Sequence, residues 1–283
     1  MRLAVAIAGD AAPPNAFVVW RGFDASIARA AEFGYHGVEL ALKEAADVDR
    51  DRLARALERA RLEVSAITTG QVFASLGLYF THPDADARRR AVEVFRGLSD
   101  LAKDFGRMVN IGRARGFVAD AQPREEAERL FLDTARRVCD DAAGRGVAVV
   151  IEPVNRYEIN FVNTLDEGAA LLDRLGRANA GLMPDTFHMN IEEARPGDAL
   201  ARHGARVKYV HLADSNRLAP GQGHLDFDDV FDGLARAGYD GWASIEILPR
   251  PDPDTAARRA AETVIPWLRA YDGRRRAAAG SAP

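Results

Sequence analysis

The chain has 283 residues, of which 47% are hydrophobic and 28% are charged, and its formal net charge at pH 7 is −4. This composition is typical of a folded globular protein and excludes intrinsic disorder for most of the chain. The negative charge argues against a nucleic-acid partner, because binding to phosphates depends on a basic surface.

The first apolar run, from Met1 to Ala8, predicts a buried strand. It is short for a signal peptide, and Gly9 and Asp10 follow it at once. No apolar run approaches the roughly 18 residues of a membrane span. The chain has one cysteine, Cys139, which excludes an internal disulfide and a cysteine-cluster zinc site. We therefore expect a cytoplasmic protein that makes no membrane contact.

Short apolar runs then alternate with longer amphipathic stretches along almost the whole chain. Several of the apolar runs follow a glycine of the kind that ends a helix, which favours strands at these positions. The predicted strands are Leu3–Ala8, His36–Ala41, Glu63–Ile67, Met108–Ile111, Val147–Ile151, Ala180–Met183, Val207–Leu212 and Trp242–Ile247. The intervening stretches predict helices such as Asp84–Phe105, Pro123–Ala143 and Thr164–Leu175. In the last of these, Thr164 and Glu167 have the spacing of a capping box.

Eight alternations of strand and helix predict an α/β protein that is a single (β/α)₈ TIM barrel, covering residues 1–272. The alternative is an open, doubly wound sheet. However, no G-x-G-x-x-G follows the first strand, and no Walker-type phosphate loop is present. Residues 273–283 start with Gly273, continue with three arginines and then with small residues, which predicts a flexible tail.

Polar residues end the last four predicted strands. They are Glu152, Asp185, His211 and Glu246, separated by 33, 26 and 35 residues. Because the active site of a barrel lies at the C-terminal ends of its strands, these four side chains should meet at one rim. Each residue taken singly has an ordinary structural explanation, such as a helix cap or an ion pair. Their shared position on successive strands favours a common site.

Three carboxylates and one imidazole at one place would repel each other unless a cation lay between them. Such a donor set suits one divalent ion, with Mn²⁺ or Mg²⁺ favoured and Co²⁺, Fe²⁺ or Zn²⁺ also compatible. Glu158, His188 and Arg217 follow the same strands and would face the ion, where their hydrogen bonds suit a polyol.

At these residues the chain resembles the xylose-isomerase-like TIM-barrel sugar isomerases and epimerases, in particular the ketose 3-epimerases of the D-tagatose 3-epimerase type. The matching motifs are Glu152-x-x-Asn155-Arg156-x-Glu158, Asp185-Thr186-Phe187-His188-Met189-Asn190, His211-x-x-x-Ser215-Asn216-Arg217, and Gly238-Tyr239-Asp240-Gly241 before Glu246. They span about Val147 to Ile247.

The N-terminal half looks most like the branch that contains 5-keto-L-gluconate epimerase. The cues are Thr69-Gly70-Gln71, Thr81-His82-Pro83 and Ile111-Gly112-Arg113-Ala114-Arg115-Gly116. Aromatic residues that some ketohexose epimerases place after the fourth strand are missing from the last segment. Arg113 and Arg115 could bind the carboxylate of a keto-aldonate, or they could simply be solvated arginines.

The resemblance implies a role for each of these positions. Glu152, Asp185, His211 and Glu246 would bind the metal, Glu158, His188 and Arg217 would hold the carbonyl end of the sugar, and Glu152 and Glu246 would be the catalytic acid/base pair. The implied reaction is the epimerisation of a keto-sugar or keto-aldonate through a cis-enediolate, and relatives are usually dimers or tetramers.

Other reactions stay open on the same scaffold. An aldose–ketose isomerase would return the proton to the neighbouring carbon, and a lyase would eliminate a group from a 3-keto sugar. An apurinic endonuclease would need further histidines on the earlier strands, and a non-catalytic sugar-binding protein would not need two acid/base carboxylates.

Overall fold

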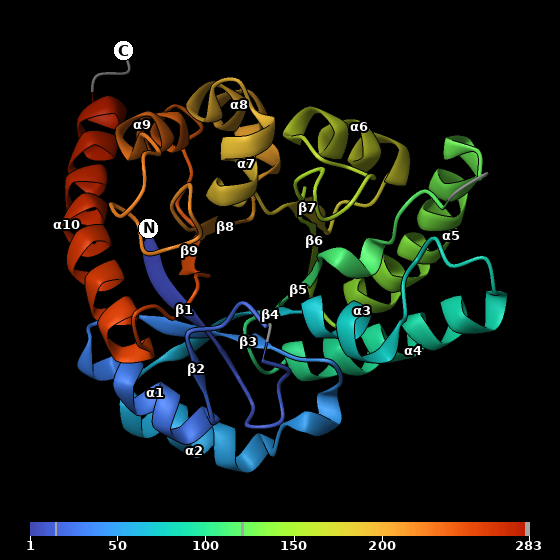
Figure 1. Cartoon of the computed structure of the whole chain (residues 1–283), viewed down its shortest axis with the longest axis horizontal. Coiled ribbons are helices and arrows are strands. Elements are labelled where there is room, and N and C mark those ends of the chain that lie inside the picture. Colours follow the sequence, from blue (N-terminus) through green and yellow to red (C-terminus); the bar gives the residue numbers. More distant parts are fainter. Residues whose placement is uncertain (15, 120–121, 281–283) are drawn as a thin grey trace.

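The structure is a computed structural model that describes residues 1–14, 16–119 and 122–280. Parallel strands form a central ring, and helices surround it (Figure 1). The ring strands are β1 (Arg2–Ala8), β3 (Gly37–Ala41), β4 (Glu63–Thr68), β5 (Met108–Ile111), β6 (Ala148–Ile151), β7 (Ala180–Leu182), β8 (Tyr209–Leu212) and β9 (Trp242–Ile245). The TIM barrel that the strand count predicts is therefore confirmed.

The strands pair in the order β7-β6-β5-β4-β3-β1-β9-β8. Two isolated parallel bridges, Leu182 to Val207 and Asp185 to His211, join the β7 and β8 segments and close the ring. Each predicted strand is present, with ends that shift by about two residues at most. A short strand that the sequence did not predict, β2 (Trp20–Arg21), pairs with the C-terminal end of β1.

Helices alternate with the strands along the chain. They are α1 (Phe23–Glu32), α2 (Arg50–Ala60), α3 (Gly70–Leu76), α4 (Ala85–Ala102), α5 (Arg124–Ala143), α6 (Leu165–Leu175), α7 (Thr186–Glu192), α8 (Pro196–His203), α9 (Phe227–Arg236) and α10 (Pro253–Gly280). The predicted cap of α6 is confirmed, because the Thr164 hydroxyl accepts a hydrogen bond from the Glu167 amide at 3.1 Å. None of the helices in the described ranges combines the length and apolar character of a membrane span.

The alternation of side chains along each strand separates two environments. Leu3, Val5 and Ile7 of β1 belong to the large core between strands and helices, so the residues between them face the interior of the ring. By the same alternation, Glu39, Asn110, His211 and Ser244 face that interior, because both strand neighbours of each residue lie in the large core. The interior of the ring therefore contains these four polar side chains.

The C-terminal helix α10 continues to Gly280. The expected tail begins at residue 273, so its first part is helical in the structure, and residues 281–283 lie outside the described residues. Its flexibility stays a prediction.

Candidate active site

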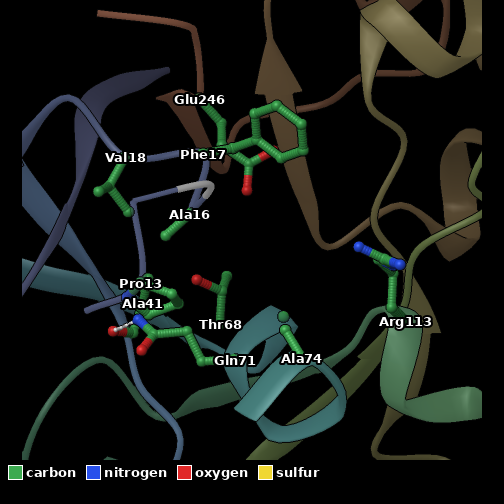
Figure 2. Close-up of a pocket in the computed structure, with 11 residues that line it drawn as sticks. Pro13, Ala16, Phe17, Val18, Ala41, Thr68, Gln71, Ala74, Arg113 and Glu246 are labelled. Carbon is green, nitrogen blue, oxygen red and sulfur yellow. Dashed lines mark hydrogen bonds between the residues drawn. The ribbon is translucent and has the colours of Figure 1, made fainter. Parts of the chain in front are cut away.

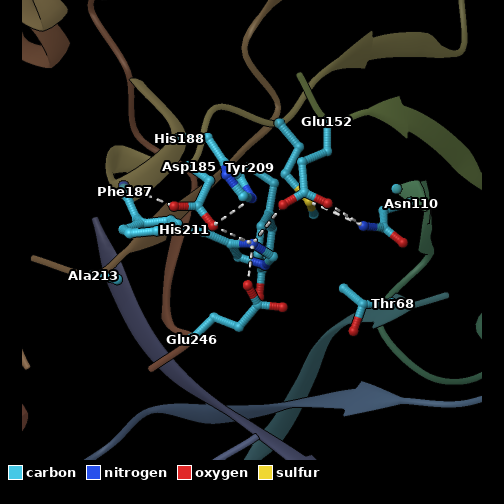
Figure 3. Close-up of polar contacts among 12 residues, drawn as sticks. Thr68, Asn110, Glu152, Asp185, Phe187, His188, Tyr209, His211, Ala213 and Glu246 are labelled. Carbon is cyan, nitrogen blue, oxygen red and sulfur yellow. Dashed lines mark hydrogen bonds and ion pairs between the residues drawn. The ribbon is translucent and has the colours of Figure 1, made fainter. Parts of the chain in front are cut away.

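Four acidic and imidazole side chains meet at the C-terminal rim of the ring, as Figure 3 shows. Glu152 directly follows β6, Asp185 is the N-cap residue of α7, and Glu246 directly follows β9. His211 lies inside β8, one residue before its end. One potential ligand atom from each residue lies within 4.8 Å of the others. The rim therefore gathers the four side chains that the strand ends predict.

The His211 ring is at the centre of this group. Its Nδ1 atom lies 3.4 Å from Glu152 Oε1, 3.7 Å from Asp185 Oδ2 and 3.5 Å from Glu246 Oε2. The atom is buried and has no hydrogen-bond partner in the described part of the chain. A buried nitrogen without a partner is costly, and a metal ion would satisfy it. Three carboxylates with one imidazole are also a donor set that divalent cations accept, so the residues fit a metal ion.

The crowding of charge shifts the proton affinities of these groups. Burial, together with the neighbouring charges of Glu152 and Asp185, raises the pKa of Glu246 to about 8 although His211 and Arg217 act in the opposite direction. For Asp185, burial is outweighed by Arg217 and His188, which hold its pKa well below the usual range. Burial would lower the pKa of His211, but the surrounding carboxylates, Glu39 first, raise it well above the ordinary value. Metal-free, the site thus retains protons near neutral pH.

Arg217 lies against two of the four side chains. Its Nη1 donates to Asp185 Oδ2 at 2.6 Å, and its Nη2 contacts Glu246 Oε2. The rings of Phe17 and Phe187 lie 5.0 and 4.8 Å from the guanidinium carbon. Its backbone has a φ of 62°, a left-handed conformation that is uncommon for a residue with a side chain. The structure thus holds this cation beside the carboxylates.

Glu158 and His188 are joined to the cluster through Asn155. The Asn155 amide donates to Glu158 Oε1 at 3.1 Å and to His188 Nδ1 at 2.8 Å. Because an amide nitrogen can only donate, His188 Nδ1 accepts and its Nε2 carries the proton. That Nε2 lies 3.9 Å from Asp185 Oδ2. The three predicted substrate contacts, Glu158, His188 and Arg217, therefore surround the Asp185 side of the site.

The two arginines after β5 lie in different environments. Arg115 is fully buried, and its nitrogens donate to the backbone oxygens of Gly112, Glu152, Phe161 and Val162. Burial lowers its pKa to about 10. Arg113 is only partly buried and lies over the ring of Phe73 at 5.1 Å. Its Nε has no hydrogen-bond partner in the described ranges. Of the two, Arg113 is the one beside open space.

That open space is a cleft beside the candidate metal cluster of Glu152, Asp185, His211 and Glu246 (Figure 2), with about 520 Å³ of empty space when open solvent is included. Glu246 and Arg113 lie at two sides of it, and four apolar residues after β1 line a third: Pro13, Ala16, Phe17 and Val18. Thr68 and Gln71 line the floor near the end of β4. A cleft with apolar walls and a few polar groups suits a small ligand.

Two buried side chains that sequence reasoning missed contact the cluster. Glu39 Oε2 lies 2.9 Å from His211 Nε2, and Asn110 Nδ2 donates to Glu152 Oε2 at 3.1 Å. The available signal was a polar residue in the middle of an otherwise apolar run, at Glu39 of β3 and Asn110 of β5. It is weak because a single polar residue in a strand has many explanations.

Comparison with known proteins agrees with this geometry. Residues 27–271 match the model of a family described as xylose isomerase-like TIM barrel. The L-ribulose 3-epimerase of Mesorhizobium japonicum is 32% identical over 221 residues, which cover 76% of this chain and 71% of the relative. The ketose 3-epimerase of Arthrobacter globiformis is 33% identical over 236 residues, 79% of each chain. A solved structure of D-allulose 3-epimerase from Methylomonas sp., in complex with D-allulose, aligns with a TM-score of 0.81 and 27% identity over 94% of this chain and 98% of the other.

Proposed function

This chain belongs to the xylose isomerase-like TIM barrel family, and from that premise we propose that it is a metal-dependent epimerase of a keto-sugar or keto-aldonate. The observation that carries the proposal is the buried group of Glu152, Asp185, His211 and Glu246. At its centre lies His211 Nδ1, which has no hydrogen-bond partner among the residues that the structure describes. The relatives named as ketose 3-epimerases support the same reaction class.

The proposed metal ligands are these four residues, and the proposed ion is Mn²⁺, with Mg²⁺, Co²⁺, Fe²⁺ or Zn²⁺ as alternatives. The oxygen-rich donor set supports Mn²⁺ or Mg²⁺ over a structural zinc, which prefers sulfur and nitrogen. When bound, the ion would supply positive charge that makes the proton next to a ketone easier to remove.

Glu152 and Glu246 are the proposed acid/base pair. They follow β6 and β9, which are separated in the ring by β7 and β8, so they approach a bound molecule from different sides. One carboxylate removes the proton from the carbon beside the carbonyl, giving a flat cis-enediolate. The other, protonated, returns a proton to the opposite face, and the carbon is inverted.

Glu158, His188 and Arg217 are proposed to hold the carbonyl end of the substrate. Their positions around Asp185, and the hydrogen bonds through Asn155, support this role. The sequence also offers Arg113 and Arg115 as substrate contacts. The burial of Arg115 and its four backbone partners support a role in shaping the loop after β6 instead, which leaves Arg113 as the proposed contact.

Arg113 bears on the choice between a neutral and an acidic substrate. No carboxylate pairs with it within the ranges that the structure describes, and it borders the cleft. A keto-aldonate would bring the missing carboxylate. Substitution Arg113→Met should then raise KM for a keto-aldonate about tenfold and leave KM for the matching neutral keto-sugar unchanged, because only the acidic substrate loses a charged hydrogen bond. Equal effects on both substrates would contradict the acidic substrate.

The test of the reaction is proton exchange in D₂O. With Mn²⁺ and a panel of keto-sugars and keto-aldonates, the wild type should incorporate deuterium at one carbon and produce the epimeric ketone, as measured by NMR. Glu246→Gln should abolish turnover and incorporation, whereas Glu262→Gln, an exposed position on α10, should change neither. Normal rates in Glu246→Gln would reject the role of Glu246.

The same experiment separates the alternatives. An aldehyde product would indicate an aldose–ketose isomerase, and an unsaturated or truncated product would indicate a lyase. Treatment with EDTA followed by Mn²⁺ should remove and restore activity.

The cytoplasm is the proposed compartment. The proposed assembly is a homo-dimer or homo-tetramer, and measurement of the molecular mass in solution tests it.

A further inference from the structure

Glu39 lies in the middle of β3, inside the ring, and is fully buried. None of the roles assigned above involves this residue. Moving a carboxylate out of water costs several kcal/mol unless it is paired. Within the described part of the chain, no lysine or arginine pairs with Glu39, and its ion-pair partner is His211. Stability alone therefore does not explain why a carboxylate is buried at this place.

Donors surround the Glu39 carboxylate. His211 Nε2 and the Tyr209 hydroxyl lie 2.9 and 3.0 Å from Oε2, and the Thr68 hydroxyl donates to Oε1 at 3.0 Å. The Ser65 hydroxyl in turn lies 2.6 Å from the Tyr209 oxygen. When the Tyr209 and Thr68 hydroxyls and His211 Nε2 each direct a proton at the carboxylate, Glu39 accepts three hydrogen bonds. Its orientation is therefore fixed from two sides.

This arrangement determines which side of the His211 ring faces the cluster. The ring presents Nε2 to Glu39 and Nδ1 to the oxygens of Glu152, Asp185 and Glu246. A hydrogen bond from one ring nitrogen to a carboxylate fixes the ring and makes the other nitrogen a better donor to a metal. Figure 3 shows the His211 ring among the carboxylates of Asp185, Glu152 and Glu246, with Tyr209 beside it.

We propose that Glu39 is a positioning residue for the metal centre: through the Nε2 hydrogen bond, it holds His211 with Nδ1 aimed at the ion. The inference rests on the proposed function only in that His211 binds a metal. Glu39 is not a ligand, because His211 separates it from the cluster. Its role is to set metal affinity, and it acts on the reaction only through His211.

The experiment measures Mn²⁺ binding to metal-free protein by calorimetry, without substrate. Glu39→Gln keeps the shape and removes the charge, and it should weaken Mn²⁺ binding 10- to 100-fold. Tyr209→Phe is the matched control, because it removes another hydrogen bond to the same Oε2 and leaves the contact with His211. It should stay within about threefold of wild type. Glu39→Asp keeps the charge but has a shorter side chain, so it should also weaken Mn²⁺ binding. It replaces Glu39→Gln as the test variant if that variant does not fold.

A second readout reports on the hydrogen bond itself. In Zn²⁺-loaded protein with ¹⁵N-labelled histidine, the His211 Nε2 proton should resonate far downfield in wild type and in Tyr209→Phe, and should move upfield in Glu39→Gln. A folded Glu39→Gln protein with wild-type Mn²⁺ affinity would overturn the inference and leave the proposed epimerase intact. A wild type that binds no divalent ion would instead reject the metal site, and both proposals with it.

Discussion

The two proposed acid/base carboxylates are held differently by their neighbours. Asn110 donates to Glu152 Oε2, and the amide of Asn110 is itself oriented by the Thr69 backbone N–H, which donates to its Oδ1 at 2.7 Å. Glu246 is contacted at Oε2 by Arg217 and borders the cleft. Glu152 is thus anchored inside the ring, whereas Glu246 faces the space where a ligand would lie.

The raised pKa values of Glu246, about 8, and of His211 predict competition between protons and metal. A metal ligand must lose its proton, so at pH 7 each bound Mn²⁺ should release about two protons, one from each residue. Apparent affinity should therefore increase steeply as the pH rises from 6 through 8, because both groups lose their protons to the metal. Calorimetry in buffers of different ionisation enthalpy measures the proton number, and a value near zero would contradict the prediction.

The same shifts predict how the stability of the metal-free protein depends on pH. Both groups have a folded pKa above the unfolded value, so the folded state binds more protons. Their contribution is complete below the unfolded values of 4.5 for Glu246 and 6.5 for His211, and it is lost as the pH rises through the folded values. Metal-free protein should therefore begin to lose thermal stability as the pH rises above 4.5, through Glu246, and should lose it more steeply above 6.5, where His211 also contributes; Mn²⁺-loaded protein should lose less.

At the level of residues, the sequence predicted the four candidate ligands because they recur at the ends of successive strands. It did not predict Glu39 or Asn110. Their importance comes from partners far away in the chain: 172 residues separate Glu39 from His211, and 42 separate Asn110 from Glu152. The sequence also offered Arg113 and Arg115 as equivalent, whereas the turn that contains them buries one and leaves the other beside the cleft.

At the level of elements, Arg115 connects two segments that carry the site. It belongs to the short 3₁₀ turn Arg113–Arg115 after β5, and its guanidinium bonds the oxygens of Phe161 and Val162 at the far end of the loop after β6. The same loop carries Asn155 and Glu158. One buried cation therefore sets the shape of the loop on which these polar side chains lie.

Replacing Arg115 with Met should lower the free energy of unfolding by about 2–4 kcal/mol, because it leaves buried backbone oxygens without donors. Arg113→Met is the matched control two residues away. Since Arg113 makes no such bonds within the described ranges, its loss should cost less than about 1 kcal/mol. Urea denaturation of both variants measures the difference, and equal losses would show that Arg115 is not a structural clamp.

Strands and long helices were predictable for a reason that does not apply to the short elements. β1 and α5 are long enough for their apolar periodicity to be visible in the sequence. β2 has two residues and α3 and α7 have seven each, so their positions depend on contacts with the rest of the rim. These short elements follow strand ends, where the cleft and the cluster lie. The sequence therefore predicted the strands and long helices that position the site better than the short elements that line it.

At the level of the whole molecule, the candidate metal cluster spans the joint at which the ring closes. β7 and β8 are joined by two isolated bridges, whereas β1 pairs with β3 over five residue pairs. Glu152 and Asp185 lie on the β7 side of this joint, and His211 and Glu246 on the β8 side. One ion bound by all four would therefore connect the two sides of a sparsely paired joint in the ring.

Hydrogen–deuterium exchange should detect this connection. A ligand that binds only the folded state stabilises it by an amount that grows with concentration, about 2.7 kcal/mol at 100 times Kd. If the ion connects the joint, Mn²⁺ should slow exchange most in peptides that cover residues 180–185 and 207–212. Peptides of β1, paired on both edges, should change least. Because an ion that merely stabilised the whole fold would slow β1 as much as β7 and β8, a uniform effect would contradict a role in ring closure while leaving metal binding itself intact.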